Sequence, residues 1–152
     1  MRHLPVLLLS GLLGNLASAQ MPDGAALFTQ NCALCHQSGG AGLAGQFPRL
    51  AGRVGPISAK PAGRAYLVDV LTYGMVGTVT VDGQPIIGQM PSFASLPDEQ
   101  VAAILGYLQG LGGAPKESFT VAEVTAGRAK DKKSGSDVLA ERAKLAASGV
   151  VK

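Results

Sequence analysis

Cys32 and Cys35 are the only cysteines of this 152-residue sequence, and His36 directly follows the second of them. This C-x-x-C-H arrangement is the pattern to which c-type haem is attached. Two thiols at this spacing reach both vinyl groups of one porphyrin, and the following histidine then lies below the iron as its proximal ligand. The pattern predicts one covalently bound haem c, attached through Cys32 and Cys35.

Other uses of these residues fit less well. A thioredoxin-like pair belongs in a βαβ unit, and no strand is expected before Cys32. A zinc site needs four ligands, but only two cysteines and one histidine follow residue 19. A plain disulfide would leave His36 unexplained. A hydrolase would have to take its general base from the haem motif, so no catalytic residues are predicted.

Residues 1–19 have the pattern of a secretory signal peptide, with Arg2 near the start, an apolar stretch over 4–16 and the cleavage sequence Ala17-Ser18-Ala19. The alternative is a membrane anchor, but the apolar run is short for a span of about 20 residues. We expect cleavage after Ala19, export to a bacterial periplasm and no membrane span in the mature protein.

Composition indicates a globular domain. Charged residues make up 15% of the chain, hydrophobic residues 47% and aromatic residues only 5%. So few large side chains suggest that the chain wraps a large group that is not protein. The net charge is +3, but residues 20–115 hold four basic and five acidic residues, a net charge of −1. Without a basic, aromatic face, no nucleic-acid partner is expected.

Hydrophobic periodicity and turn residues predict the elements of a domain over 20–115. Asp23 has the position of a helix N-cap, and Asp82-Gly83 is a two-residue hairpin turn. The predicted elements are a helix running toward Cys32, a glycine-rich loop over 39–45, a helix over 64–73 ended by Gly74, a hairpin with strands 78–81 and 84–87, and a last helix from 97–99.

Residues 116–152 form a basic, partly helical extension. Helices are predicted from the capping box at Thr120 to about 130 and over 137–147, with a solvated, flexible stretch over 130–136 between them. The extension is expected to be a loosely packed appendage; the alternative is a docking segment for a redox partner.

The order of these motifs over residues 22–112 resembles the class I (mitochondrial-type) cytochrome c family, in particular its small bacterial exported members with one haem. The resemblance implies an all-α fold of three to four core helices around one covalent haem. To that fold this chain adds a short β-hairpin insertion and the C-terminal helical extension.

The resemblance also implies the remaining haem-binding residues. The sixth iron ligand of the family is a methionine before the last helix, often followed by proline, which selects Met90 over Met75. Pro48 matches the proline whose carbonyl oxygen accepts a hydrogen bond from the proximal histidine, and Leu50 matches a leucine packed on the haem. Further matches are Gly24 and Phe28, which cross the last helix at Tyr107. Arg53, Arg64 and Tyr66 are candidates for contacts with the haem propionates, with an ordinary surface or core role as the alternative.

The predicted function is one-electron transfer by an electron carrier that is not itself an enzyme. The expected partners are a dehydrogenase as donor and an oxidase or reductase as acceptor, met through a transient interface, and the chain is expected to be a monomer unless it belongs to a complex. Two alternatives remain: a dedicated cytochrome c subunit of a periplasmic dehydrogenase, and a haem sensor with an open sixth site.

Overall fold

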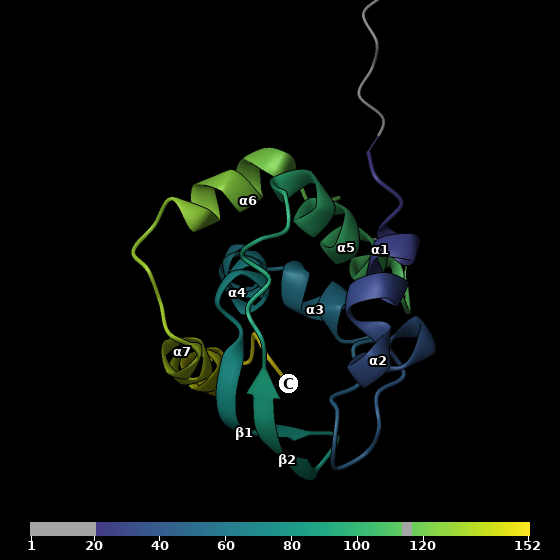
Figure 1. The fold of residues 1–152 in the computed structure, drawn as a ribbon. Coiled ribbons are helices and arrows are strands. Elements are labelled where there is room, and N and C mark those ends of the chain that lie inside the picture. Colours follow the sequence, from purple (N-terminus) through teal and green to yellow (C-terminus); the bar gives the residue numbers. More distant parts are fainter. Residues whose placement is uncertain (1–20, 114–116) are drawn as a thin grey trace, which may run out of the picture.

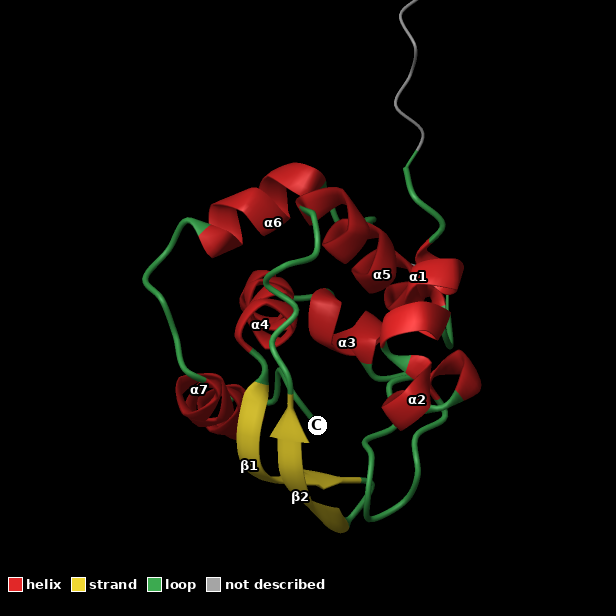
Figure 2. Cartoon of the chain, viewed as in Figure 1, coloured by secondary structure: helices red, strands yellow, loops and turns green. Residues whose placement is uncertain are grey.

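The computed structural model describes residues 21–113 and 117–152, so the predicted signal peptide lies outside the described residues. The fold is mostly helical, with one small two-stranded antiparallel sheet (Figures 1 and 2). The elements in chain order are α1 (Gly24–Asn31), α2 (Ala33–His36), the 3-10 helix η1 (Ser38–Gly40), α3 (Val54–Ser58), α4 (Pro61–Tyr73), β1 (Met75–Val81), β2 (Gln84–Met90), α5 (Asp98–Gly110), α6 (Val121–Arg128) and α7 (Gly135–Ala147).

Helices α1 and α5 cross at the positions that the sequence predicted. Asp23 is the N-cap of α1, where its carboxylate accepts hydrogen bonds from the backbone N–H groups of the first turn. A Cβ atom at Gly24 would lie 2.1 Å from the carbonyl oxygen of Ala103, so only glycine permits this approach. Phe28 packs on Tyr107 with ring centroids 5.4 Å apart. The predicted helix crossing is therefore confirmed.

Helix α4 is longer than predicted. It begins at Pro61 rather than at Arg64. Proline is well suited to the first position of a helix, because the N–H group of that residue would have no partner within the helix. Helix α4 ends where the sequence indicated, at Gly74, which has a φ of 72°. The short helix α3 was not predicted, since five residues are too few to show a helical period.

The hairpin is also longer than predicted. Its turn is formed by Asp82 and Gly83, both with positive φ, as the sequence indicated. The antiparallel pairing extends from this turn to the pair Met75 and Met90, three residues beyond the predicted strand ends. Met90 is therefore the last residue of β2, and its position is fixed by strand pairing.

The tail over 117–152 is part of the main core, which corrects the expectation of a loosely packed appendage. Figure 1 shows α6 beside α4 and α5, and α7 beside β1. The tail contributes side chains that are almost completely buried in the same hydrophobic cluster as the rest of the chain: Phe119, Val124, Val138 and Val151. Burial of apolar surface on this scale stabilises the docked tail.

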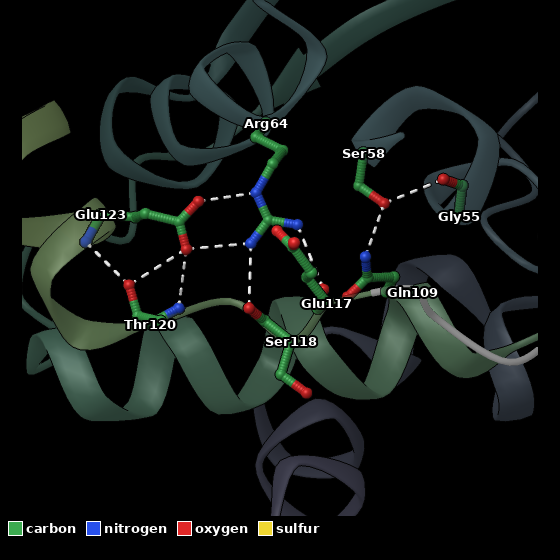
Figure 3. Close-up of polar contacts among 8 residues, drawn as sticks. All are labelled: Gly55, Ser58, Arg64, Gln109, Glu117, Ser118, Thr120 and Glu123. Carbon is green, nitrogen blue, oxygen red and sulfur yellow. Dashed lines mark hydrogen bonds and ion pairs between the residues drawn. The ribbon is translucent and has the colours of Figure 1, made fainter. Parts of the chain in front are cut away.

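Ion pairs reinforce the docking of the tail. In Figure 3, Arg64 of α4 reaches Glu123 of α6, with Nε 2.6 Å from Oε1. Lys133 lies 2.7 Å from the carboxylate of Asp69, which is 5% exposed. Ser134 forms a capping box at the start of α7. The stretch 130–136 was predicted to be solvated and flexible, but the ion pair of Lys133 and the capping box of Ser134 both hold it in place. The ion pair forms because the buried carboxylate of Asp69 needs a charged partner.

Candidate haem site

The C-x-x-C-H motif lies where α1 meets α2. Cys32 ends α1 with a φ of −125° and ψ of −30°, and its carbonyl oxygen accepts the N–H groups of Cys35 and His36. The motif is thereby held in a single tight turn. Both thiols are free and partly exposed, whereas His36 is only 8% exposed. This arrangement presents two free thiols beside one buried imidazole.

His36 and Pro48 are joined by a hydrogen bond of 2.9 Å between the imidazole Nδ1 and the proline carbonyl oxygen. A carbonyl oxygen can only accept, so Nδ1 carries the proton and Nε2 is left as the nitrogen that can ligate a metal. Burial lowers the pKa of His36, and the bond to Pro48 partly opposes this shift. Burial therefore favours the neutral imidazole, which is the form that binds iron, and the bond to Pro48 orients the ring.

The thiol of Cys32 is shielded from solvent. Burial, together with the neighbouring Cys35, raises the pKa of the Cys32 thiol to about 11. At neutral pH a free thiol in this position stays protonated, so it is a poor thiolate nucleophile for disulfide exchange. This disfavours Cys32 as the attacking thiol of a disulfide-exchange reaction.

One apolar cavity brings together four of the six residues predicted to bind the haem. Cys32, His36, Leu50 and Met90 all line it, whereas Pro48 contacts His36 from behind. Met75, the rival methionine, packs on the core but does not line the cavity. The other lining residues are apolar: Val54, Leu67, Val70, Leu71, Phe93, Leu96, Ile104, Leu105 and Leu108.

These residues fit a haem. An imidazole nitrogen and a thioether sulfur line one cavity whose remaining walls are apolar, and this donor pair is the one that holds haem iron in His/Met cytochromes. The walls come from α3, α4, α5 and the loop after Met90. Among the described residues no group of three or more His, Cys, Asp or Glu side chains is placed to bind a metal.

Sequence reasoning missed three wall residues, Val54, Phe93 and Leu96. Val54 belongs to the short helix α3, which has no visible period. Phe93 and Leu96 are the large apolar residues of the loop between Met90 and Asp98. They are the two large side chains of a loop that otherwise consists of Pro, Ser and Ala, and this was the available signal.

A second, larger hollow is lined by none of the six residues predicted to attach, ligate or pack on the haem, although Arg64, a candidate for the propionates, borders it. It lies among α3, α4, α5 and α6, near Ser58, Arg64 and Gln109. Figure 3 shows Gln109 donating to Ser58 Oγ at 2.9 Å, and Gln109 Oε1 has no partner in the described part of the chain. The chemistry of the lining residues, rather than the size of the hollow, makes the smaller cavity the candidate haem site.

The two candidate propionate arginines have protein partners. Arg64 is bound to Glu123 and to backbone carbonyls of the tail. Arg53 contacts Asp82 at 3.1 Å and donates to the carbonyl of Lys152. Tyr66 is buried at 3% exposure. For Arg64 these contacts favour an ordinary surface or core role over a contact with the haem propionates.

Comparison with known proteins assigns the family. Residues 19–108 match the family model described as cytochrome c oxidase, cbb3-type, subunit III. A protein named cytochrome c-552 from Thermus thermophilus is 48% identical over 139 residues, covering 88% of this chain and 92% of that protein. A second cytochrome c-552 from the same organism is 47% identical over 128 residues, covering 81% of this chain and 96% of that protein.

A more distant relative is a cytochrome c subunit of alcohol dehydrogenase (quinone) from Gluconacetobacter polyoxogenes. It is 32% identical over 114 residues, which cover 74% of this chain and 23% of that protein. The fold, the motif and these relatives agree: the chain belongs to the cytochrome c family. Within that family its matched segment is a cbb3-type cytochrome c domain. A match over 88% of the chain must extend past residue 116, so at least part of the tail is shared with the Thermus relative.

Proposed function

We propose that this chain is an exported electron carrier with one haem c, attached through Cys32 and Cys35 and ligated by His36 and Met90. The observation that carries the proposal is that His36 and Met90 line the same apolar cavity, with Nδ1 of His36 already bonded to Pro48. When bound, the haem iron supplies a one-electron couple, and the His/Met ligand pair favours its reduced form.

Each protein group has a distinct role in this proposal. Pro48 holds the tautomer and orientation of the His36 ring. Leu50 and the other apolar walls exclude water from the cavity. Met90 would supply the second protein ligand to the iron, which would leave no open site for a substrate. Among the described residues that line the cavity, only Cys32, the haem attachment point, and His36, the ligand, could act as a nucleophile or base, which supports electron transfer rather than catalysis.

Exposed apolar residues near the site support a transient interface with redox partners. Leu34, between the two cysteines, is 90% exposed, and Ile87 on β2 is 81% exposed. Small, partly apolar surfaces of this kind suit short-lived electron-transfer encounters. A dehydrogenase as donor and an oxidase or reductase as acceptor are the partners we propose.

The location we propose is the periplasm, reached through the signal peptide over 1–19 with cleavage after Ala19. Haem attachment to two cysteines takes place in exported proteins, which supports this location. In the described ranges, no helix is long and apolar enough to cross a membrane.

Visible spectra of the haem-loaded protein test the proposal. The wild type is expected to be low-spin in both oxidation states, with the weak far-red band of methionine bound to ferric iron. Met90→Leu should abolish that band, whereas Met75→Leu should keep it, because only Met90 lines the cavity. A high-spin wild type that binds carbon monoxide would contradict the proposal and indicate the sensor function with an open sixth site.

A second candidate function is a dedicated cytochrome c subunit of a dehydrogenase. The similarity to the cytochrome c subunit of alcohol dehydrogenase (quinone) favours it. Size-exclusion chromatography of the protein purified from its native host separates the two. A free carrier elutes alone, whereas a dedicated subunit elutes with a much larger partner.

A further inference from the structure

The loop over 91–97 connects the ligand strand to α5 and forms one wall of the haem cavity. It begins directly after Met90, and its residues Phe93 and Leu96 line the cavity. Strand pairing holds Met90 on its N-terminal side, and the loop holds it on its C-terminal side, so movement of the loop away from the core loosens one of the two supports of Met90. What holds this loop therefore bears on how firmly Met90 is placed.

The start of the loop is held by the end of α4. The backbone N–H of Phe93 donates to the carbonyl oxygen of Leu71 at 2.8 Å, and Ser92 Oγ donates to the carbonyl oxygen of Thr72 at 2.6 Å. These bonds fix the first three residues after Met90. They leave the second half of the loop, around Leu96, to other contacts.

Arg128, the last residue of α6, holds the second half. Its Nη1 donates to the carbonyl oxygen of Leu96 at 2.8 Å and to Asp98 Oδ1 at 2.6 Å. Its Nη2 makes a longer contact of 3.4 Å to the carbonyl oxygen of Phe93. One guanidinium thus ties two loop carbonyls to the first turn of α5. A planar group with five donors is suited to this task, whereas an ammonium group is not.

The surroundings of Arg128 strengthen these contacts. Its side chain is only 19% exposed and that of Asp98 23% exposed. Hydrogen bonds from a charged group are stronger where solvent is excluded. Asp98 is itself held by Thr125 of α6, whose hydroxyl donates to Oδ2 at 2.5 Å. The contact is therefore an ordered one between the tail and the ligand loop.

We propose that Arg128 is a positioning residue for the sixth iron ligand: from the C-terminal tail it holds the loop over 91–97 closed and so keeps Met90 on the iron. This inference rests on the proposed function, since it requires Met90 to be the ligand. It assigns the tail a role in the redox site beyond its contribution to the core.

Competition by an external ligand measures this role. Imidazole binds ferric iron only when Met90 has left it, so its apparent dissociation constant falls as the open fraction rises. The experiment titrates imidazole into the ferric, haem-loaded full chain and follows loss of the methionine–iron band. Thermal unfolding is measured alongside, so that general destabilisation is detected separately.

Arg64→Gln is the matched control for Arg128→Gln. Both substitutions cut one arginine contact of α6, but Arg64 contacts Glu123 and tail carbonyls and does not touch the loop over 91–97. Both variants are expected to unfold at lower temperature. Only Arg128→Gln is expected to bind imidazole more tightly, by about tenfold, with Arg64→Gln within about twofold of the wild type.

Arg128→Lys keeps the positive charge but has only one nitrogen that can donate, so its affinity for imidazole is expected to lie between those of the wild type and Arg128→Gln. It replaces Arg128→Gln if that variant does not retain haem. Equal imidazole affinities in the Arg128 and Arg64 variants, with the methionine band present in the wild type, overturn the inference and leave the proposed function intact. A wild type without the methionine band overturns both.

Discussion

His36 and Pro48, twelve positions apart in the sequence, are joined by one hydrogen bond between the imidazole Nδ1 and the proline carbonyl oxygen. The bond fixes which nitrogen of the ring carries the proton, and therefore which nitrogen faces a metal. A bonded Nδ1–H also makes the imidazole a more basic ligand, which stabilises ferric iron relative to ferrous iron.

Pro48→Ala is expected to raise the reduction potential. Without the fixed φ of proline the carbonyl is held less firmly, so the bond to His36 weakens and ferric iron is less stabilised. A loss of about 0.7 kcal/mol corresponds to about 30 mV for one electron. A spectroscopic redox titration measures this shift. Pro85→Ala, at an exposed hairpin position, is the control and should leave the potential unchanged.

Gly24→Ala is expected to destabilise the folded state. The new Cβ would lie 2.1 Å from the carbonyl oxygen of Ala103, so α1 and α5 must move apart, at a cost of about 1–3 kcal/mol. Urea unfolding of the haem-loaded protein measures this. Gly106→Ala is the control: Gly106 lies in α5, and a Cβ atom there would have nothing within 4 Å. This substitution should raise the free energy of unfolding by about 0.5–1 kcal/mol. An equal effect of both substitutions would contradict the close packing of α1 on α5.

Val124→Ala tests whether the tail belongs to the core. Val124 of α6 is completely buried, so removing two methyl groups should lower the free energy of unfolding by about 1–3 kcal/mol. Val76→Ala, at a residue 42% exposed on β1, should have a much smaller effect. Urea unfolding of both variants gives the comparison. A loosely attached tail predicts no difference between them.

Features encoded within a few residues could be predicted from the sequence. The motif around Cys32 and the turn at Asp82-Gly83 each depend on neighbouring residues alone, as does the capping box at Thr120, which the structure has with both of its bonds. The positions of Gly24 and Phe28 required knowledge of a family, because a helix crossing joins residues far apart in the chain.

Features that depend on distant contacts were not predictable in this way. The burial of Val151 and the pairing of Lys133 with Asp69 need the tail to fold back over α4. No local pattern indicates that a residue of a basic tail will meet a buried carboxylate. The contact of Arg128 with the loop carbonyls belongs to the same class, since Leu96 is 32 positions away.

Acid should weaken the docking of α6 through Glu123. Its hydrogen bonds with Arg64 lower the pKa of Glu123 from 4.5 to about 2. A carboxyl group whose pKa is lower in the folded state adds stability that is present above pH 4.5 and is lost as the pH falls toward 2. The side chain is 37% exposed, so screening by solvent limits this contribution to about 1 kcal/mol.

Urea unfolding between pH 6 and pH 2.5 measures this loss as a fall in the free energy of unfolding. Glu123→Gln should be less stable than the wild type at pH 6, and the difference between the two proteins should shrink as the pH falls, because protonation removes the same charge from the wild type. Glu117→Gln is the control, since Arg64 donates to the backbone carbonyl of Glu117, and the Glu117 carboxylate acts on Arg64 through its charge without a hydrogen bond. A difference between wild type and Glu123→Gln that stays constant down to pH 2.5 would show that the ion pair with Arg64 does not hold α6.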